Sequence, residues 1–313
     1  MSMRVRGWRR AAAIAALSCS ALARAADVSL PVQATLRTDD LDRFYRVYDA
    51  THGKPDAAAL QAGYLDPGTP GLRLYLSARI RSAARLQQAI AASPQDYADA
   101  RQCIAPLAET KARLPAVFAR LVELVPTARI APVTFAIGLD NTGGDTTPDG
   151  VIIGVEKMCH ATWVGADVAT RFVHIVAHEM VHVQQPAAQV DAPNPTVLYQ
   201  SLLEGGADLI GEMVSGDGIN PQLRAWTRGR ECAIEQEFRK DALSTDLSRW
   251  MYNGVGTADK PGDLGYWVGY RIAKAYVANA GDKKQALADL LGVDNDNAAA
   301  FLARSGWAPQ TGC

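Results

Sequence analysis

The chain has 313 residues, of which 48% are hydrophobic, and its 32 basic and 33 acidic residues give a formal net charge of −1. This composition supplies enough apolar side chains for one large domain or two small ones, and it excludes a chain that is disordered throughout. The charge balance lacks the basic excess that is typical of nucleic-acid-binding proteins.

Residues 1–25 have the pattern of a signal peptide. Arginines up to Arg10 precede the apolar stretch Ala11–Ala23, and Ala23-Arg24-Ala25 has the small-x-small form that signal peptidase cleaves. The apolar stretch is shorter than the ~20 residues that a membrane-spanning helix needs, and no later run is long enough. We therefore expect a periplasmic or secreted protein that starts at Ala26 and has no stable membrane span.

Two variants of this export prediction are open. Ala16-Leu17-Ser18-Cys19 could be a lipoprotein cleavage site with a lipid anchor at Cys19, although alanine is a poor first residue for it. The pair Arg9-Arg10 could belong to a twin-arginine signal. Cleavage after Ala25 would remove five arginines and no acidic residue, which leaves 27 basic residues against 33 acidic ones. A mature charge of −6 argues against a nucleic-acid partner.

Four cysteines follow the predicted cleavage site: Cys103, Cys159, Cys232 and Cys313. An even number in an oxidising compartment indicates two disulfides, and four cysteines allow three connectivities. Buried free thiols are the alternative. The chain has no C-x-x-C pair of the kind found in zinc knuckles or redox sites, so we expect these cysteines to be structural.

The segment from Asp39 to about Val125 has helical periodicity. Leu41, Phe44, Tyr45 and Tyr48 recur at three- and four-residue steps, and clusters of Pro and Gly at 53–55 and 67–71 interrupt the pattern. We expect residues 26–130 to form a helical region that lacks a cluster of catalytic residue types.

Short β-branched runs begin near residue 130. Val133–Gly138 and Val151–Val155 are expected to pair as strands across the turn-rich segment 140–150. Helices are expected from about Asp167 to Gln185 and from about Thr196 to Val214. Further helices are expected near 220–243, 263–279, 283–291 and 296–304. These elements predict an α+β fold that is mostly helical.

The helix near 167–185 contains the pattern H-E-x-x-H. Residues four apart lie on one face of a helix, so the imidazoles of His178 and His182 can bind the same ion, and Glu179 lies beside them. His174 is one turn earlier, but it would lie about 12 Å along the helix axis from His182. We therefore assign His174 to the core or to a supporting position.

The next predicted helix supplies a third ligand. Glu204 lies 22 residues after His182, and Asp208 follows one helical turn later, where its carboxylate could accept the N–H of a ligand histidine. Gly205 and Gly206 would weaken a helix by about 1 kcal/mol each relative to alanine, which indicates a close approach of a second helix. Glu212 is an alternative third ligand. His160, placed after Cys159 at the end of a strand, is a weaker candidate.

These motifs resemble the gluzincin clan of metallopeptidases. A longer set resembles a bacterial domain family of unknown function described as predicted zinc-dependent proteases; the set consists of Phe135–Gly138, Asn141–Gly144, Gly150–Glu156, His178–Gln185, Glu204–Asp208 and Gly265–Tyr270. The resemblance covers roughly residues 130–280. It implies that 131–313 is a zincin-like domain, with a small, mostly antiparallel sheet packed on the H-E-x-x-H helix and followed by the helix of Glu204.

The expected chemistry is hydrolysis of a peptide or protein substrate with one Zn²⁺ per chain. His178, His182 and Glu204 would bind the metal, and Glu179 would act as general base. Tyr266 or Tyr270 is expected to stabilise the oxyanion, unless both only pack in the core. Val151–Val155 or its partner strand could bind the substrate by strand addition. Two other functions stay open: a cell-envelope binding or assembly protein with a non-catalytic metal, and a hydrolase of a non-peptide amide or ester.

Overall fold

The computed structural model describes residues 34–309, apart from 148, 187–191, 217, 219, 255, 258 and 260. The described residues belong to one compact unit. The predicted signal peptide, Cys19 and Cys313 lie outside them. Within the described part of the chain, no helix is both long enough and apolar enough to cross a membrane. The division into 26–130 and 131–313 stays a prediction.

The first described part of the chain is helical, as expected. Its helices are α1 (Asp39–Ala50), α2 (Ala57–Leu60), α3 (Pro70–Tyr75), α4 (Ala83–Ala92), α5 (Pro94–Asp99) and α6 (Leu107–Leu124). Polar side chains cap several of them: Asp56, Thr69 and Ser82 each accept a backbone N–H from the first turn of the helix that follows. Short π-helical segments, Gln61–Leu65 and Leu76–Ile80, extend α2 and α3.

The sheet has four short strands. They are β1 (Leu36–Arg37), β2 (Val133–Ala136), β3 (Gly144–Thr147) and β4 (Gly150–Gly154), and their order in the sheet is β1-β2-β4-β3. β2 pairs in parallel with β1 and with β4, whereas β3 pairs antiparallel with β4. β2 and β4 are buried along their whole length, and β3 forms an edge of the sheet.

The expected, mostly antiparallel sheet is therefore wrong in strand direction. The segment between β2 and β4 contains β3, although its Gly, Asp and Thr residues resemble a turn. β3 forms a tight hairpin with β4, which reverses the chain once more and returns it to the direction of β2. The sheet is mixed because the chain forms one more strand than expected, β3, between the two predicted strands in the sequence.

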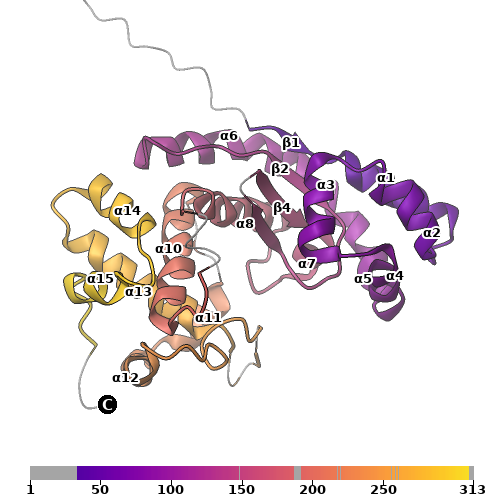
Figure 1. The fold of residues 1–313 in the computed structure, drawn as a ribbon. Helices are drawn as coiled ribbons and strands as arrows, with labels where there is room; N and C mark the ends of the chain where they lie inside the picture. Colours follow the sequence, from indigo (N-terminus) through magenta and orange to yellow (C-terminus); the bar gives the residue numbers. More distant parts are fainter. Residues whose placement is uncertain are drawn as a thin grey trace, which may run out of the picture. The chain divides into compact units, whose positions relative to one another are not determined.

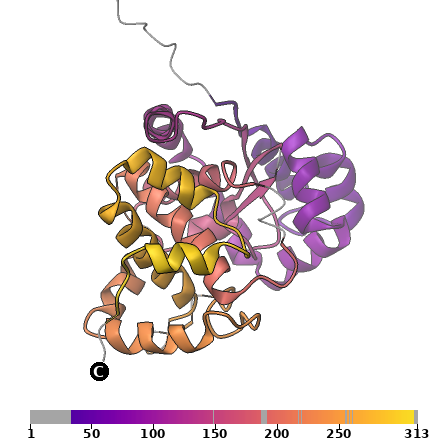
Figure 2. The ribbon, with the colours of Figure 1, turned by 60° about the vertical axis from the view of Figure 1, so that its left-hand side comes forward.

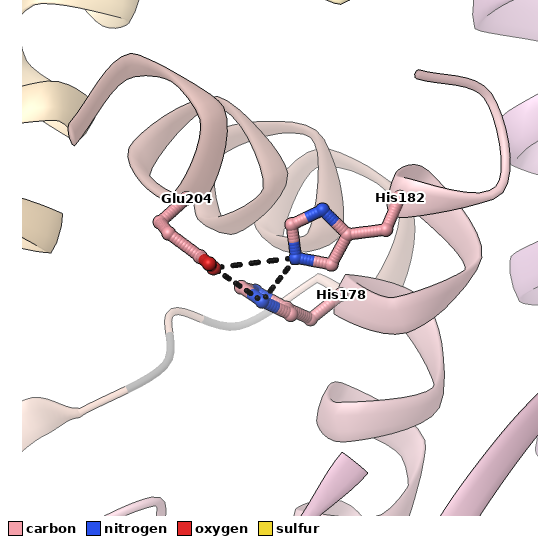
Figure 3. Close-up of side chains that lie close together, drawn as sticks. All are labelled: His178, His182 and Glu204. Atoms are coloured by element: carbon pink, nitrogen blue, oxygen red, sulfur yellow. Dashed lines mark hydrogen bonds and ion pairs between the residues drawn. The ribbon is translucent and has the colours of Figure 1, made fainter. Parts of the chain in front are cut away.

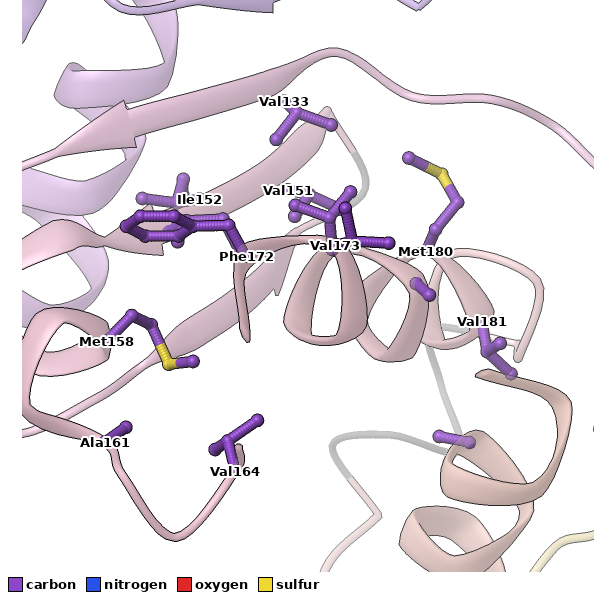
Figure 4. Packing of buried hydrophobic residues seen from close by; sticks show 14 of the residues in the cluster. Val133, Val151, Ile152, Met158, Ala161, Val164, Phe172, Val173, Met180 and Val181 are labelled. Atoms are coloured by element: carbon purple, nitrogen blue, oxygen red, sulfur yellow. The ribbon is translucent and has the colours of Figure 1, made fainter. Parts of the chain in front are cut away.

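The two faces of the sheet carry different helices. α3 packs on one face, where Gly71 is required because a Cβ there would lie 2.0 Å from the hydroxyl of Thr134. α8 (Val168–His182) packs on the other face. There Phe135 meets Phe172 edge-on, with ring centroids 5.8 Å apart, and Val133 lies over the same helix (Figure 4). Successive side chains of a strand point to opposite faces, so β2 places Val133 and Phe135 on the side of α8 and Thr134 on the side of α3.

After β4, the described part of the chain is mostly helical. Its helices are α7 (Val155–His160), α8, α10 (Val197–Ser215), α11 (Pro221–Thr227), α12 (Glu231–Asp241), α13 (Leu264–Asn279), α14 (Lys283–Leu291) and α15 (Ala298–Arg304). In two views, α10–α15 lie on the opposite side of the sheet from α1–α5 (Figures 1 and 2). The helix expected over 220–243 is divided in two near Gly229, whose φ is +77°.

α10 packs closely against α13, and glycines make this possible. A Cβ on Gly205 would lie 2.1 Å from the backbone nitrogen of Tyr270, and one on Gly269 would lie 1.7 Å from the carbonyl oxygen of Ser201. The close helix approach expected at Gly205 is thereby confirmed. Gly216 ends α10 with φ +88°.

One disulfide joins the N-terminal helices to α7, and it links Cys103 to Cys159. The rest of the predicted pairing involves Cys313, which lies outside the described residues. Near the disulfide, the buried carboxyl of Glu156 accepts backbone N–H groups from Gly138 at 2.9 Å and from Asp140 at 3.2 Å. Burial raises the pKa of Glu156 to about 7. The carboxyl thus fastens the segment that leads from β2 to β3.

Candidate functional site

The H-E-x-x-H pattern lies in the last turns of α8. The helix starts at a capping residue, Asp167, whose carboxylate accepts the N–H of Thr170 at 2.7 Å, and it continues unbroken to His182. The two imidazoles lie on one face, with their Nε2 atoms 3.0 Å apart. Both side chains are buried.

Glu204 on α10 completes the cluster. Its Oε2 atom lies 3.3 Å from Nε2 of His178 and 3.2 Å from Nε2 of His182, and Figure 3 shows the three side chains converging from two helices. These are the described side chains that could hold a metal ion together. Ligand atoms of a tetrahedral zinc site lie about 3.3–3.4 Å from one another, because each is about 2.0–2.1 Å from the ion. The spacing of the three atoms fits such a site.

Each histidine has a hydrogen-bond partner at its other ring nitrogen. Nδ1 of His178 lies 2.8 Å from Oδ1 of Asp208, and Nδ1 of His182 lies 2.6 Å from Oε1 of Gln185. Both partners accept the Nδ1 proton, which leaves Nε2 free to donate its lone pair to a cation. The supporting position expected for Asp208 is where the structure places it, whereas the contact of Gln185 was not anticipated.

Electrostatics at this point favours a positive charge. Burial lowers the pKa of His178, but the carboxylates of Asp208 and Glu204 outweigh it and raise the pKa well above its usual range. For Glu204 the directions are reversed: burial raises its pKa, but the two imidazoles outweigh burial and lower the pKa strongly. The buried carboxylate of Glu204 and the half-buried carboxylate of Asp208 therefore stabilise a cation at the two imidazoles.

Glu179 lies beside the cluster, under the edge strand. The hydroxyl of Thr146 on β3 lies 2.6 Å from Oε2 of Glu179 and 3.0 Å from its backbone oxygen. Gly144 packs directly on the carboxylate, since a Cβ there would lie 2.4 Å from Oε1. The strand that resembled a turn in the sequence thus determines where this carboxylate points.

The cluster opens into a cleft of about 900 Å³. Asn141–Thr146 lines one side of it, and residues of the loop before α13 line another. β4 lies between β2 and β3, and β2 lies between β1 and β4, so neither Val151–Val155 nor its expected partner Val133–Gly138 is an exposed edge. The edge strand at the cleft is β3, which was not one of the two expected strands and which can pair with an extended ligand.

The tyrosines of α13 occupy different places. Tyr266 lines the cleft. Tyr270 is not among the described residues that line it: its ring lies 4.5 Å from the guanidinium of Arg224, and its hydroxyl accepts a hydrogen bond from Nζ of Lys274 at 3.2 Å. A third tyrosine, Tyr252, was missed. Its hydroxyl donates to Oε1 of Glu204 at 2.8 Å.

The other candidate residues lie apart from the cluster. Nδ1 of His174 is 2.9 Å from the hydroxyl of Ser215 in the core. His160 belongs to α7 rather than to a strand end, which corrects the expectation, and its Nε2 lies 3.3 Å from the carbonyl oxygen of Asp96. Glu212 forms an ion pair with Arg224.

A family model described as "Predicted Zn-dependent protease" matches residues 140–295. The matched segment starts after β2 and contains all three residues of the buried cluster. No curated protein and no solved structure matches the chain.

Proposed function

Residues 140–295 belong to a family of predicted zinc-dependent proteases, and from this premise we propose that the chain is an exported zinc metallopeptidase of the gluzincin type with a zincin-like core. One observation supports this most strongly. The buried cluster of His178, His182 and Glu204 faces an open cleft, with the carboxylate of Glu179 next to it.

His178, His182 and Glu204 would hold the metal through Nε2, Nε2 and Oε2, the atoms that already lie together. A divalent cation bound there would act as a Lewis acid toward a carbonyl group and would lower the pKa of water to about 7. A set of three protein ligands, rather than four, is typical of catalytic zinc sites.

Glu179 would take a proton from the attacking water and deliver it to the leaving amine. The hydroxyl of Thr146 lies 2.6 Å from Oε2 of this carboxylate and would help to keep it in place beside the cluster. Glu179 is buried in the cleft wall, where exclusion of water strengthens its interactions with charged groups.

The substrate would be an extended peptide segment that adds to the edge of β3. An unpaired strand edge offers backbone N–H and C=O groups to a peptide in the same conformation, and β3 carries Gly144 and Thr146, which touch Glu179. Pairing along β3 would therefore bring a peptide bond close to the proposed base.

Two other functions compete with this proposal: a cell-envelope binding or assembly protein with a non-catalytic metal, and a hydrolase of a non-peptide amide or ester. Glu179 speaks against the first, because a structural metal site has no need of an unliganded carboxylate at an open cleft. Activity assays with peptide substrates and with non-peptide amides or esters distinguish peptide hydrolysis from non-peptide hydrolysis.

The test measures zinc content and hydrolysis of an unstructured protein by the purified chain. We expect about one zinc per chain, loss of hydrolysis after treatment with a chelator, and recovery when zinc is added back. A zinc-loaded chain that cleaves neither unstructured proteins nor peptides would favour the binding protein. A chain that binds no zinc would contradict the ligand set.

We predict that Gly144→Ala lowers hydrolysis while zinc binding is retained. The new methyl group would lie 2.4 Å from Oε1 of Glu179 and would displace the carboxylate, and such a misplacement can reduce a rate by about 10²-fold. The measurement is kcat/KM together with bound zinc.

Gly165→Ala is the matched control, because a Cβ on Gly165 meets no atom within 4 Å and its φ is not in the left-handed region. Wild-type activity in Gly144→Ala would show that this contact does not position Glu179.

A further inference from the structure

We propose that Tyr252 is a positioning residue for the third metal ligand, with its hydroxyl holding one oxygen of Glu204 so that the other faces the two imidazoles. This inference rests on the proposed function, since it requires that the cluster bind a metal. It assigns a role to the loop between α12 and α13, which carries none of the three ligands.

The contacts of Glu204 are divided between its two oxygens. Oε2 lies 3.2 and 3.3 Å from the imidazoles, whereas Oε1 accepts the hydroxyl of Tyr252 at 2.8 Å. A carboxylate free to rotate could present either oxygen or both. The hydrogen bond to Oε1 fixes the plane of the group and selects Oε2 as the oxygen that meets a cation.

The direction of the Tyr252 hydrogen bond is determined by a further residue. The side-chain amide of Gln200 donates to the phenol oxygen of Tyr252. Because an amide N–H occupies a lone pair of that oxygen, the single hydroxyl proton points toward Glu204. Gln200 lies one turn before Glu204 on α10 and is buried, so ligand and amide are held by the same helix.

The backbone of the loop holds Tyr252 in place. Tyr252 has φ +56°, in the left-handed region that non-glycine residues rarely adopt. The next residue, Asn253, exchanges two hydrogen bonds with Asp263, one from each backbone N–H to the other side chain, at 3.0 and 2.6 Å. Such reciprocal bonding closes the base of the loop and maintains the strained conformation at Tyr252.

Tyr252 completes a pattern in which every ligand has one polar partner. Asp208 supports His178 and Gln185 supports His182, and Tyr252 is the corresponding partner of Glu204. Removing partners of this kind typically weakens metal binding about 10–100-fold. Tyr252 is 58% exposed and lines the cleft, so its hydroxyl can be removed without opening the core.

The experiment compares Tyr252→Phe with Tyr266→Phe. Both variants remove one phenol hydroxyl from the same cleft, and the two wild-type rings meet edge-on with centroids 6.4 Å apart. Within the described residues, Tyr252 rather than Tyr266 donates a hydrogen bond to Glu204. Zinc affinity is measured by competition with a chromogenic chelator. We expect about 10–100-fold weaker binding for Tyr252→Phe and wild-type affinity for Tyr266→Phe. Gln200→Leu should weaken binding in the same direction.

The outcomes separate this inference from the proposed function. Wild-type zinc affinity in Tyr252→Phe would overturn the positioning role, and so would a loss of activity in that variant without a change in affinity, since the phenol would then act on the substrate. Equal weakening in both phenylalanine variants would also contradict it, because a general loosening of the cleft would explain both. Failure of the wild-type chain to bind zinc would instead contradict the proposed function itself.

Discussion

Glu179→Gln is expected to lower hydrolysis by about 10²–10⁴-fold while one zinc per chain remains bound. Glutamine has the same shape and can still accept the hydroxyl of Thr146, which lies 2.6 Å from the wild-type carboxylate. It cannot take up a proton, so the attacking water would lose its base. The measurement is kcat/KM on an unstructured protein, with bound zinc determined on the same sample.

Glu109→Gln serves as the control, because this glutamate lies on the exposed surface of α6. Activity of Glu179→Gln within about threefold of wild type would exclude the general-base role, since that role is worth at least about 10²-fold. Loss of zinc from Glu179→Gln would point instead to Glu179 as a ligand.

Glu204→Ala should abolish zinc binding at concentrations that saturate the wild-type chain, and activity should be lost with it. The substitution removes a carboxylate whose Oε2 atom lies 3.3 Å from Nε2 of His178 and 3.2 Å from Nε2 of His182. The loss should exceed the ~10–100-fold weakening that follows from removing a hydrogen-bond partner of a ligand. Elemental analysis after dialysis, and chelator competition for the residual affinity, measure the effect.

Glu212→Ala is the matched control on the same helix. Two turns beyond Glu204, this carboxylate pairs with Arg224 and is not among the described residues that line the cleft. We expect it to keep wild-type zinc affinity. Zinc binding that survives Glu204→Ala but is lost in Glu212→Ala would reverse the assignment of the third ligand.

The cluster of His178, His182 and Glu204 could be predicted from the sequence because its geometry is mostly local. A helix fixes the relation between His178 and His182, and a second helix fixes that between Glu204 and Asp208. Joining the two pairs required one long-range assumption, namely that a catalytic zinc site takes a third protein ligand from the next helix. The resemblance to the family of predicted zinc-dependent proteases is confirmed over 140–295.

Three other residues around the cluster could not be predicted in the same way. Thr146, Gln185 and Tyr252 reach the cluster through an edge strand, a helix end and a loop, and their sequence neighbourhoods show no periodicity that points to a site. The two tyrosines that were singled out lie on α13, four residues apart and therefore about one turn from each other. Their spacing could not show that Tyr266 lines the cleft while Tyr270 contacts Arg224.

The strand directions were missed for a related reason. A two-strand interpretation of 133–155 assumes one reversal of the chain, and an odd number of reversals gives antiparallel neighbours. Residues 144–147 did not reveal the second reversal, because Gly144 and Asp145 are poor strand formers and leave only Thr146 and Thr147 as β-branched residues. β3 is a strand because it pairs with β4 and packs against α8.

The Cys103–Cys159 disulfide encloses α6 and the strands β2, β3 and β4 within one covalent loop, because its cysteines are 56 residues apart. In the unfolded chain the loop excludes the most extended conformations and so lowers the conformational entropy that unfolding gains. The loop-closure model gives a corresponding increase of about 4 kcal/mol in the free energy of unfolding. Much of this stabilisation would be lost in a reducing compartment. The cross-link therefore ties the persistence of the cleft to an oxidising environment, which is the environment that the predicted signal peptide would provide.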